Sequence, residues 1–370
     1  MKIISVKINP LNELADLQVE RPRVILLAAL VLTGFMVTGL PSIQIQTDFQ
    51  ASLPDDLPPI QTQDKVESEF RSSSSILILF QTTDDQLKDG YVTDMRDPRM
   101  IRMQNSLTQQ LESESIVGNV RSTASLFSDN PENIEQVKTA VERSGQGSQL
   151  FNRDYTATQM FVSLDEEMSE ENINKASNLI NEALDDTAKQ PGVEITVTGS
   201  PILRTDIGTI LVDDSVTTIS AASLLILTLL TLTRGRVYGP ITFVPLFVGL
   251  LWTLGTMGLA GIPLTIATIA LGAMILGLGV EYGSFITERI LEEKEEKSVE
   301  EAVKSAVPTT GLAILGSSTT TVVGFSALLI ASISFIRDLG LTLSIGIILT
   351  LTSALVITPA LIVEFERWRK

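Results

Sequence analysis

The chain of 370 residues contains no cysteine and no histidine. Without cysteine it can form neither a disulfide framework nor a thiolate metal site. Without histidine it lacks the commonest metal ligand and the side chain best suited to carry protons near neutral pH. We therefore expect no cofactor and no bound metal. Any proton chemistry must use carboxylates, tyrosine, lysine or bound water.

Positive charge is scarce as well. The formal net charge is −17, and residues 44–211 alone hold 28 acidic and 13 basic residues, a net charge of −15. An acidic segment of this kind is typical of a soluble domain. It argues against nucleic acid as a partner, because binding to phosphates needs clustered lysine and arginine.

Long apolar runs fill much of the remaining chain, with one before the acidic segment and five after it. A helix needs about 20 mostly apolar residues to cross a bilayer. The runs are Val24–Leu40, Val216–Leu232, Pro240–Leu259, Thr265–Phe285, Gly311–Ile330 and Leu339–Ile362. We predict an α-helical membrane protein with six transmembrane helices in a 1+5 arrangement. The alternative, core helices of a large soluble protein, fits poorly with six runs that hold almost no charge.

Lysine and arginine in the short connecting segments predict the orientation. Cytoplasmic loops carry an excess of these residues. They gather on one side of the predicted spans, at Arg21, Arg23, Arg234, Arg236, Arg289, Lys294, Lys297, Lys304, Arg367, Arg369 and Lys370. Both termini are therefore predicted to be cytoplasmic, and the acidic domain extracytoplasmic.

These features divide the chain into five parts. They are a cytoplasmic interfacial segment (1–23), a first span (24–43), an extracytoplasmic domain (44–211), a bundle of five spans (212–363) and a cytoplasmic tail (364–370). In the first part, Leu11, Leu14 and Leu17 fall on one side of a possible interfacial helix. Within the bundle, residues 298–307 predict an amphipathic helix along the membrane. Ser298 and Glu301 form a capping-box pattern there, and Pro308 is expected to end the helix.

The acidic domain alternates strand and helix patterns. Strands are predicted at residues 74–82, 116–122, 156–164 and 193–199, and helices at 98–111, 133–143 and 169–192, the last capped by Ser169. The order is consistent with an α+β domain of the ferredoxin type, which is a split βαβ sandwich.

A single carboxylate interrupts the apolar runs of the last four predicted spans. It belongs to the stretch "GLGVEYGSF", in which Glu281 is followed by Tyr282 and surrounded by Gly277, Gly279 and Gly283. A charge near mid-bilayer costs about 2.5–3.5 kcal/mol on insertion scales, so it persists mainly where it serves a pathway or a partner. Desolvation can bring a carboxyl pKa towards neutrality, which makes Glu281 a candidate proton carrier with Tyr282 as its neighbour. A protonated structural glutamate, or one that reaches the cytoplasmic face, is the alternative.

The fifth predicted span contains five consecutive hydroxyl residues, Ser317, Ser318, Thr319, Thr320 and Thr321. Such hydroxyls can bond back to carbonyls of their own helix and be merely tolerated. Because five of them cover more than one turn, we expect at least one to face the side of Glu281 and to form a hydrated polar seam with it. The spacing Gly279-x-x-x-Gly283 favours close helix packing, as Gly277 does nearby, although it is a weak signal alone.

At these residues the chain resembles the RND superfamily, and within it the MMPL-like or hydrophobe/amphiphile exporter branch, which is related to sterol-sensing and Patched-type proteins. The stretch "PLTIATIALGAMILGLGVEYGSFITERILEE" (263–293) is similar to the signature helix, in which a Gly-rich turn carries an Asp-Tyr pair. The stretch "GSSTTTVVGFSALLIASISFIRDLGLTLSIGIILTLTSALVITPALI" (316–362) is similar to the fifth and sixth spans. The lone span, the outward domain and the five clustered spans match one half of such a transporter.

The chain departs from that pattern in two ways. Glu281 stands where the branch usually has Asp. Family transporters usually have twelve spans, whereas this chain has the layout of one half. The resemblance therefore implies a homodimer about a two-fold axis. A second half-transporter or a missing half is the alternative.

The resemblance implies a secondary transporter, not an enzyme, in the plasma membrane of a prokaryote. The expected function is export of hydrophobic or amphiphilic, lipid-like substrates, driven by the proton motive force and with membrane lipids as partners. Two alternatives remain. One is an accessory subunit of protein export of the SecD/SecF type, whose members carry Asp-Ala-Asn where this chain has Glu281-Tyr282-Gly283. The other is a non-transporting lipid sensor or organiser.

Overall fold

The computed structural model describes residues 10–47, 53–54, 57–62, 65, 75–83, 89–164 and 170–369. The chain forms two compact units. The first unit comprises Met1–Asp55 and Ile210–Lys370, and the second comprises Asp56–Thr209. Each is described by itself.

The second unit contains a four-stranded sheet. Its strands are β1 (Ser75–Thr82), β2 (Val117–Arg121), β3 (Ala157–Leu164) and β4 (Val193–Thr198), in the order β2-β3-β1-β4 with every neighbouring pair antiparallel. Alternate side chains of β1, namely Ile76, Ile78 and Phe80, are fully buried on one face. This alternation is the period of two that a half-covered sheet requires.

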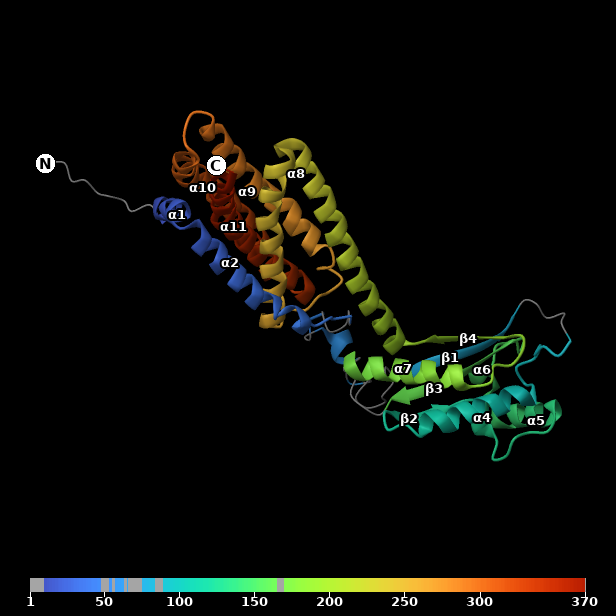
Figure 1. Cartoon of the computed structure of the whole chain (residues 1–370). Coiled ribbons are helices and arrows are strands. Elements are labelled where there is room, and N and C mark those ends of the chain that lie inside the picture. The colour runs from blue at the N-terminus through green and yellow to red at the C-terminus, as the bar shows by residue number, and fades with distance from the viewer. Residues whose placement is uncertain are drawn as a thin grey trace. The chain divides into compact units, whose positions relative to one another are not determined.

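Helices fill the connections between these strands. They are α4 (Pro98–Glu112) between β1 and β2, the short η3 (Thr123–Leu126), α5 (Ile134–Ser144) and α6 (Gly147–Leu150) between β2 and β3, and α7 (Glu170–Asp186) between β3 and β4 (Figure 1). Asp97 caps α4 by accepting a hydrogen bond from the backbone N–H of Arg99, and Asn133 caps α5 by accepting one from the backbone N–H of Gln136. α7 ends at Asp186, before Pro191, and its predicted cap Ser169 lies outside the described residues.

The first unit is helical. It contains α1 (Pro10–Glu20), α2 (Pro22–Val37), η1 (Leu40–Ser42), α8 (Ser200–Ala260, whose first turns belong to the second unit), α9 (Leu271–Lys294), α10 (Val299–Ser326), η4 (Ala327–Ile330) and α11 (Ser334–Arg369). Gly235, with φ 84° and ψ 169°, interrupts α8 and divides it into two limbs, which cover the second and third apolar runs (Figure 1). Only glycine adopts this backbone conformation readily.

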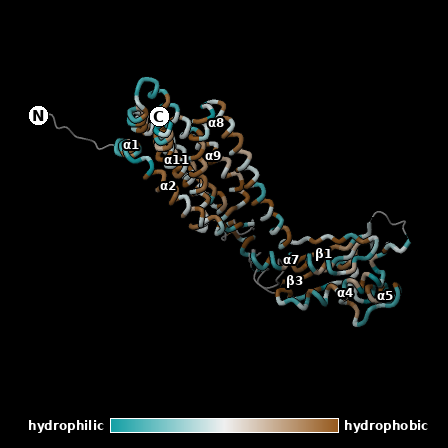
Figure 2. The backbone as a smooth tube through the Cα atoms, viewed as in Figure 1, coloured by the Kyte–Doolittle hydropathy of each residue, from teal (hydrophilic) through white to brown (hydrophobic). Residues whose placement is uncertain are grey.

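Apolar residues follow these helices along most of their length (Figure 2). Within the described residues, four helical stretches are long and apolar enough to cross a membrane: Pro22–Ser42, Ser200–Ala260, Val299–Ile330 and Ser334–Arg369. α9 is not among them. It ends beyond the predicted span, at Lys294, and it starts six residues late because a hydrogen-bonded turn precedes it. In that turn Thr268 Oγ1 accepts from Thr265 N, and Leu271 N donates to Thr268 O.

Pro308 does not end a helix, contrary to the prediction for residues 298–307. α10 runs through it from Val299 to Ser326, and the capping box of Ser298 with Glu301 is present at its start. A proline removes a single backbone donor, so only the bond to Lys304 O, four residues earlier, is lost, and the helix continues on both sides of Pro308.

The predicted apolar face of residues 298–307 is buried against protein. Val299, Ala302, Val303, Ala306 and Val307 all belong to the hydrophobic core of the first unit. They share that core with Ala15 and Val19 of α1, so this part of α10 is covered by α1. α1 itself differs from its prediction at one position, because Leu17 is 44% exposed and Gln18 is buried in its place. Residues 1–9 lie outside the described residues.

Candidate functional site

Glu281 lies on an uncovered face of α9. Met274, Gly277 and Phe285 are exposed as well, and their spacing places them on the same face of the helix as Glu281. An added Cβ at Gly277 would meet nothing within 4 Å. Among the described residues, Glu281 has no hydrogen-bond or ion-pair partner. The alternative of a structural glutamate held by hydrogen bonds inside the bundle therefore has no support in the described part of one protomer. Its side chain is free to face lipid, water or another protein.

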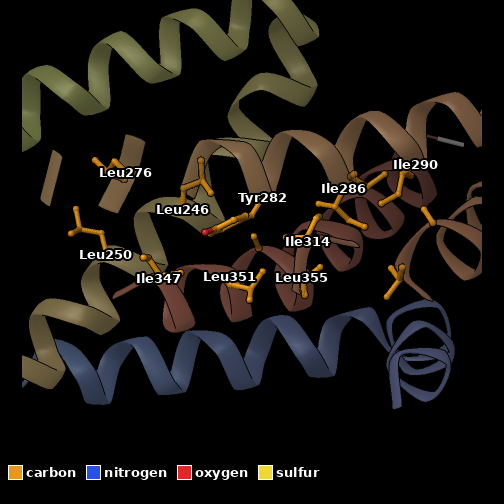
Figure 3. Packing of buried hydrophobic residues seen from close by; sticks show 14 of the residues in the cluster. Leu246, Leu250, Leu276, Tyr282, Ile286, Ile290, Ile314, Ile347, Leu351 and Leu355 are labelled. Carbon is orange, nitrogen blue, oxygen red and sulfur yellow. The ribbon is translucent and has the colours of Figure 1, made fainter. Parts of the chain in front are cut away.

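Tyr282 points to a different environment from its neighbour. It is only 3% exposed and belongs to the core cluster, in which Leu246, Ile347 and Leu351 also lie (Figure 3). Successive residues of an α-helix are rotated by about 100°, so neighbours seldom share a face. The structure thus does not bring the Tyr282 hydroxyl and the Glu281 carboxylate into a hydrogen bond.

The hydroxyl run of α10 bonds mostly to its own helix. Ser318 and Thr319 donate to Leu315 O at 3.1 and 2.6 Å, and Thr320 and Thr321 donate to Ser317 O at 2.7 and 3.3 Å. No hydrogen bond joins this run to Glu281 within the described chain, so the predicted seam between them does not form inside one protomer. Three of its members, Ser317, Thr319 and Thr320, lie on exposed surface, as Glu281 does.

The glycines around Glu281 divide into two kinds. Gly279 and Gly283 are buried where helices approach closely. An added Cβ at Gly279 would lie 2.5 Å from Thr350 Cγ2 of α11, and one at Gly283 would lie 3.1 Å from Thr242 Cγ2 of α8. Gly277 instead lies on the exposed face with Glu281. The first two glycines allow α9 to pack closely against α8 and α11. Gly277 instead leaves a position without a side chain on the exposed face, close to Glu281.

Sequence reasoning missed a set of buried hydroxyls between α8, α9 and α11. Thr242 Oγ1 and Thr287 Oγ1 are 2.9 Å apart, and Ser353 Oγ donates to Pro245 O at 2.6 Å. Thr350 is fully buried, and its Oγ1 has no partner among the described residues. Isolated threonines in apolar runs give no distinctive sequence signal, so only tertiary packing shows that these side chains meet. Hydrogen bonds of this kind join helices inside a membrane.

A charged cluster joins the same three helices at the end that carries the chain's basic residues. Lys294 Nζ of α9 lies 2.7 Å from Glu366 Oε1 of α11 and donates to the Tyr238 hydroxyl of α8 at 2.9 Å. Tyr238 in turn donates to Glu366. Arg234 of α8 pairs with Glu288 of α9 at 2.8 Å beside it. In the sequence Arg234 and Lys294 indicated orientation only, whereas in the fold they also connect α8, α9 and α11 through these contacts.

Comparison with known proteins agrees with the apolar helices. The model of the MMPL family matches residues 52–370. A protein of Methanocaldococcus jannaschii, named as a membrane protein, is 30% identical over 367 residues, which cover 96% of this chain and 94% of the relative. Together with the apolar helices, this match identifies a membrane protein. The chain belongs to the MMPL family.

Proposed function

We propose that the protein exports hydrophobic or amphiphilic, lipid-like compounds by a proton-coupled mechanism of the RND type. It acts as a secondary transporter in the plasma membrane of a prokaryote, with both termini cytoplasmic and the second unit extracytoplasmic. The observation that carries the proposal is Glu281, a carboxylate within the apolar first part of α9 that has no hydrogen-bond or ion-pair partner among the described residues. Membership of the MMPL family supports the transport function.

The architecture supports the assignment to this class of transporter. α2, the two limbs of α8, α9, α10 and α11 overlap the six apolar runs, with α9 shifted along its run, and this overlap supports six spans in a 1+5 arrangement. The order β2-β3-β1-β4, with α4 and α7 in the β1–β2 and β3–β4 connections, supports a ferredoxin-like porter domain. The second unit would collect substrate from the outer leaflet.

The exposed position of Glu281 supports a homodimer. A carboxylate facing hydrocarbon costs about 2.5–3.5 kcal/mol on insertion scales, and a second protomer over this face would remove that contact. Gly277 would allow the close approach of two α9 helices. The exposed hydroxyl residues Ser317, Thr319 and Thr320 would add polar groups to the surface of α10 that another protomer could cover. In that arrangement two Glu281 residues face each other across the two-fold axis.

Proton coupling then follows from a change of environment at Glu281. Desolvation favours the neutral carboxyl and hydration favours the carboxylate, so alternate access of water from the two sides loads and releases a proton. Tyr282 adjusts this step indirectly, because its burial in the core fixes the rotation of α9 and thereby the direction of Glu281. The energy source is the proton motive force, and no cofactor is needed.

Substitution of Glu281 tests the proposal. Glu281→Gln keeps the shape of the side chain but cannot exchange a proton, so we expect proton-driven efflux of a fluorescent amphiphile from reconstituted vesicles to fall at least tenfold. Glu281→Asp should retain measurable efflux. The matched control Glu292→Gln, near the charged end of the same helix, should transport normally. Full proton-dependent efflux by Glu281→Gln would refute the assignment.

A further inference from the structure

Pro359 leaves a gap in the hydrogen bonding of α11. Proline has no backbone N–H, so the carbonyl four residues earlier, at Leu355, loses its helical donor. Leu355 is 5% exposed, and Pro359 is buried beside it. A carbonyl buried in this way needs another donor, because an unpaired backbone group away from water is costly.

Gln18 of α1 supplies a donor at this gap. Its Nε2 donates to Leu355 O at 2.7 Å and approaches Val356 O at 3.2 Å, across a sequence separation of more than 330 residues. Gln18 is fully buried, which is rare for this residue type unless its amide is bonded. Its Oε1 has no partner among the described residues, so the bonds from Nε2 are what favour its burial.

Other contacts hold α1 in the same place. Ala15 and Val19 pack into the core beside Val299 and Ala302 of α10. Arg367 Nη2 of α11 donates to Val19 O at 2.8 Å, and Asp16 pairs with Lys304 of α10 at 2.6 Å. The Asp16–Lys304 pair is half exposed and contributes little. Gln18 is thus the residue of α1 that supplies the hydrogen-bond donor missing in α11.

We propose that α1 is a latch on α11, in which Gln18 replaces the backbone donor that Pro359 removes. Docking of α1 then fixes α11 around its proline. Release of α1 exposes the carbonyl of Leu355 and loosens α11 at that point. This inference uses the contacts of α1 with α10 and α11 and does not rest on the proposed transport function.

A double-mutant cycle in the purified full-length protein tests the latch. Gln18→Leu leaves Leu355 O without a donor, and we expect the midpoint of thermal unfolding in detergent to fall by several degrees. Pro359→Ala restores a backbone N–H to Leu355 O. In that background Leu355 O keeps its backbone donor when Gln18→Leu removes the amide with its unpaired Oε1, so the effect of Gln18→Leu should disappear or change sign. Equal losses in both backgrounds would overturn the proposal, because Gln18 would then act independently of the proline.

Thiol labelling measures docking directly, because the chain has no cysteine of its own. Ala15→Cys lies on the buried side of α1 and should react slowly with a maleimide, while the exposed control Asn12→Cys reacts rapidly. We expect Gln18→Leu to raise the labelling rate at position 15 at least fivefold and Pro359→Ala to reverse most of that rise. The control rate should not change. If position 15 stays protected in Gln18→Leu, the latch does not exist.

Gln18→Asn, which is too short to reach Leu355 O, serves as the second variant if Gln18→Leu does not fold.

Discussion

At the scale of single residues, Thr350 is the point where three helices meet. An added Cβ at Gly279 of α9 would lie 2.5 Å from Thr350 Cγ2, and one at Gly249 of α8 would lie 2.8 Å from Thr350 Oγ1. A threonine on a helix has few rotamers through which to move away. Two glycines on two helices therefore accommodate one side chain of α11.

Gly279→Ala should accordingly destabilise the bundle. Overpacking of a filled core costs about 1–3 kcal/mol, and Thr350→Ser should restore most of the loss because it removes Cγ2. The control Gly34→Ala on α2 meets nothing within 4 Å and should be neutral or slightly stabilising. Thermal unfolding in detergent measures all three variants. A Gly279→Ala protein as stable as the parent would contradict this description of the packing.

At the scale of the element, the start of α4 is fixed by two turns of Asp-x-Arg. Asp94 lies 2.7 Å from Arg96, and Asp97 lies 2.8 Å from Arg99 while capping the helix. Burial raises the pKa of the Asp97 carboxyl, but the hydrogen bonds and the charge of Arg99 outweigh burial, and the pKa lies below its ordinary value. Asp94 behaves in the same way with Arg96.

This lowered pKa predicts an acid-sensitive helix start. Because the unfolded chain binds the proton more tightly than the folded one, the stabilisation is present above the unfolded pKa of about 3.9 and is lost as pH falls through the lower folded value. Asp97→Asn still accepts the cap bond but carries no charge, so part of the acid-dependent loss should vanish. Asp97→Ala should cost about 0.5–2 kcal/mol at neutral pH.

Hydrogen exchange of the α4 amides in the full-length chain measures this effect, with rates expressed as variant over parent at each pH. The ratio for Asp97→Asn should approach one, or fall below it, as the solution is acidified. A ratio independent of pH would show that Asp97 does not contribute through its charge.

At the scale of the whole molecule, the proposed dimer predicts both a mass and a contact. The purified particle should contain twice the 40.1 kDa of one chain once detergent is subtracted. A single cysteine introduced at Gly277 should form a disulfide between protomers, because that residue lies on the exposed face with Glu281. Gly34→Cys, on α2, is the control and should not cross-link. A particle of one chain, or cross-linking at position 34 alone, would contradict the proposed interface.

The sequence by itself determined the elements and their order. Runs of apolar residues, the Ser298–Glu301 cap and the alternation of β1 require only neighbours along the chain, so the apolar helices, the start of α10 and the four strands could be predicted. The isolated carboxylate at Glu281 was visible for the same reason. Pro308 and Thr265 misled the prediction, because the loss of one backbone bond at Pro308 does not end α10, and a hydrogen-bonded turn at Thr265 and Thr268 delays the start of α9.

Only the tertiary structure decided which face of each helix is covered. Glu281 and Tyr282 are adjacent in sequence, yet one is exposed and the other lies in the core, because coverage depends on the helices packed against α9. The same is true of Gln18, which reads as a polar residue of a surface helix and is buried against the carbonyl that Pro359 leaves free. Contacts between residues hundreds of positions apart leave no periodic trace in one sequence, so packing alone could reveal them.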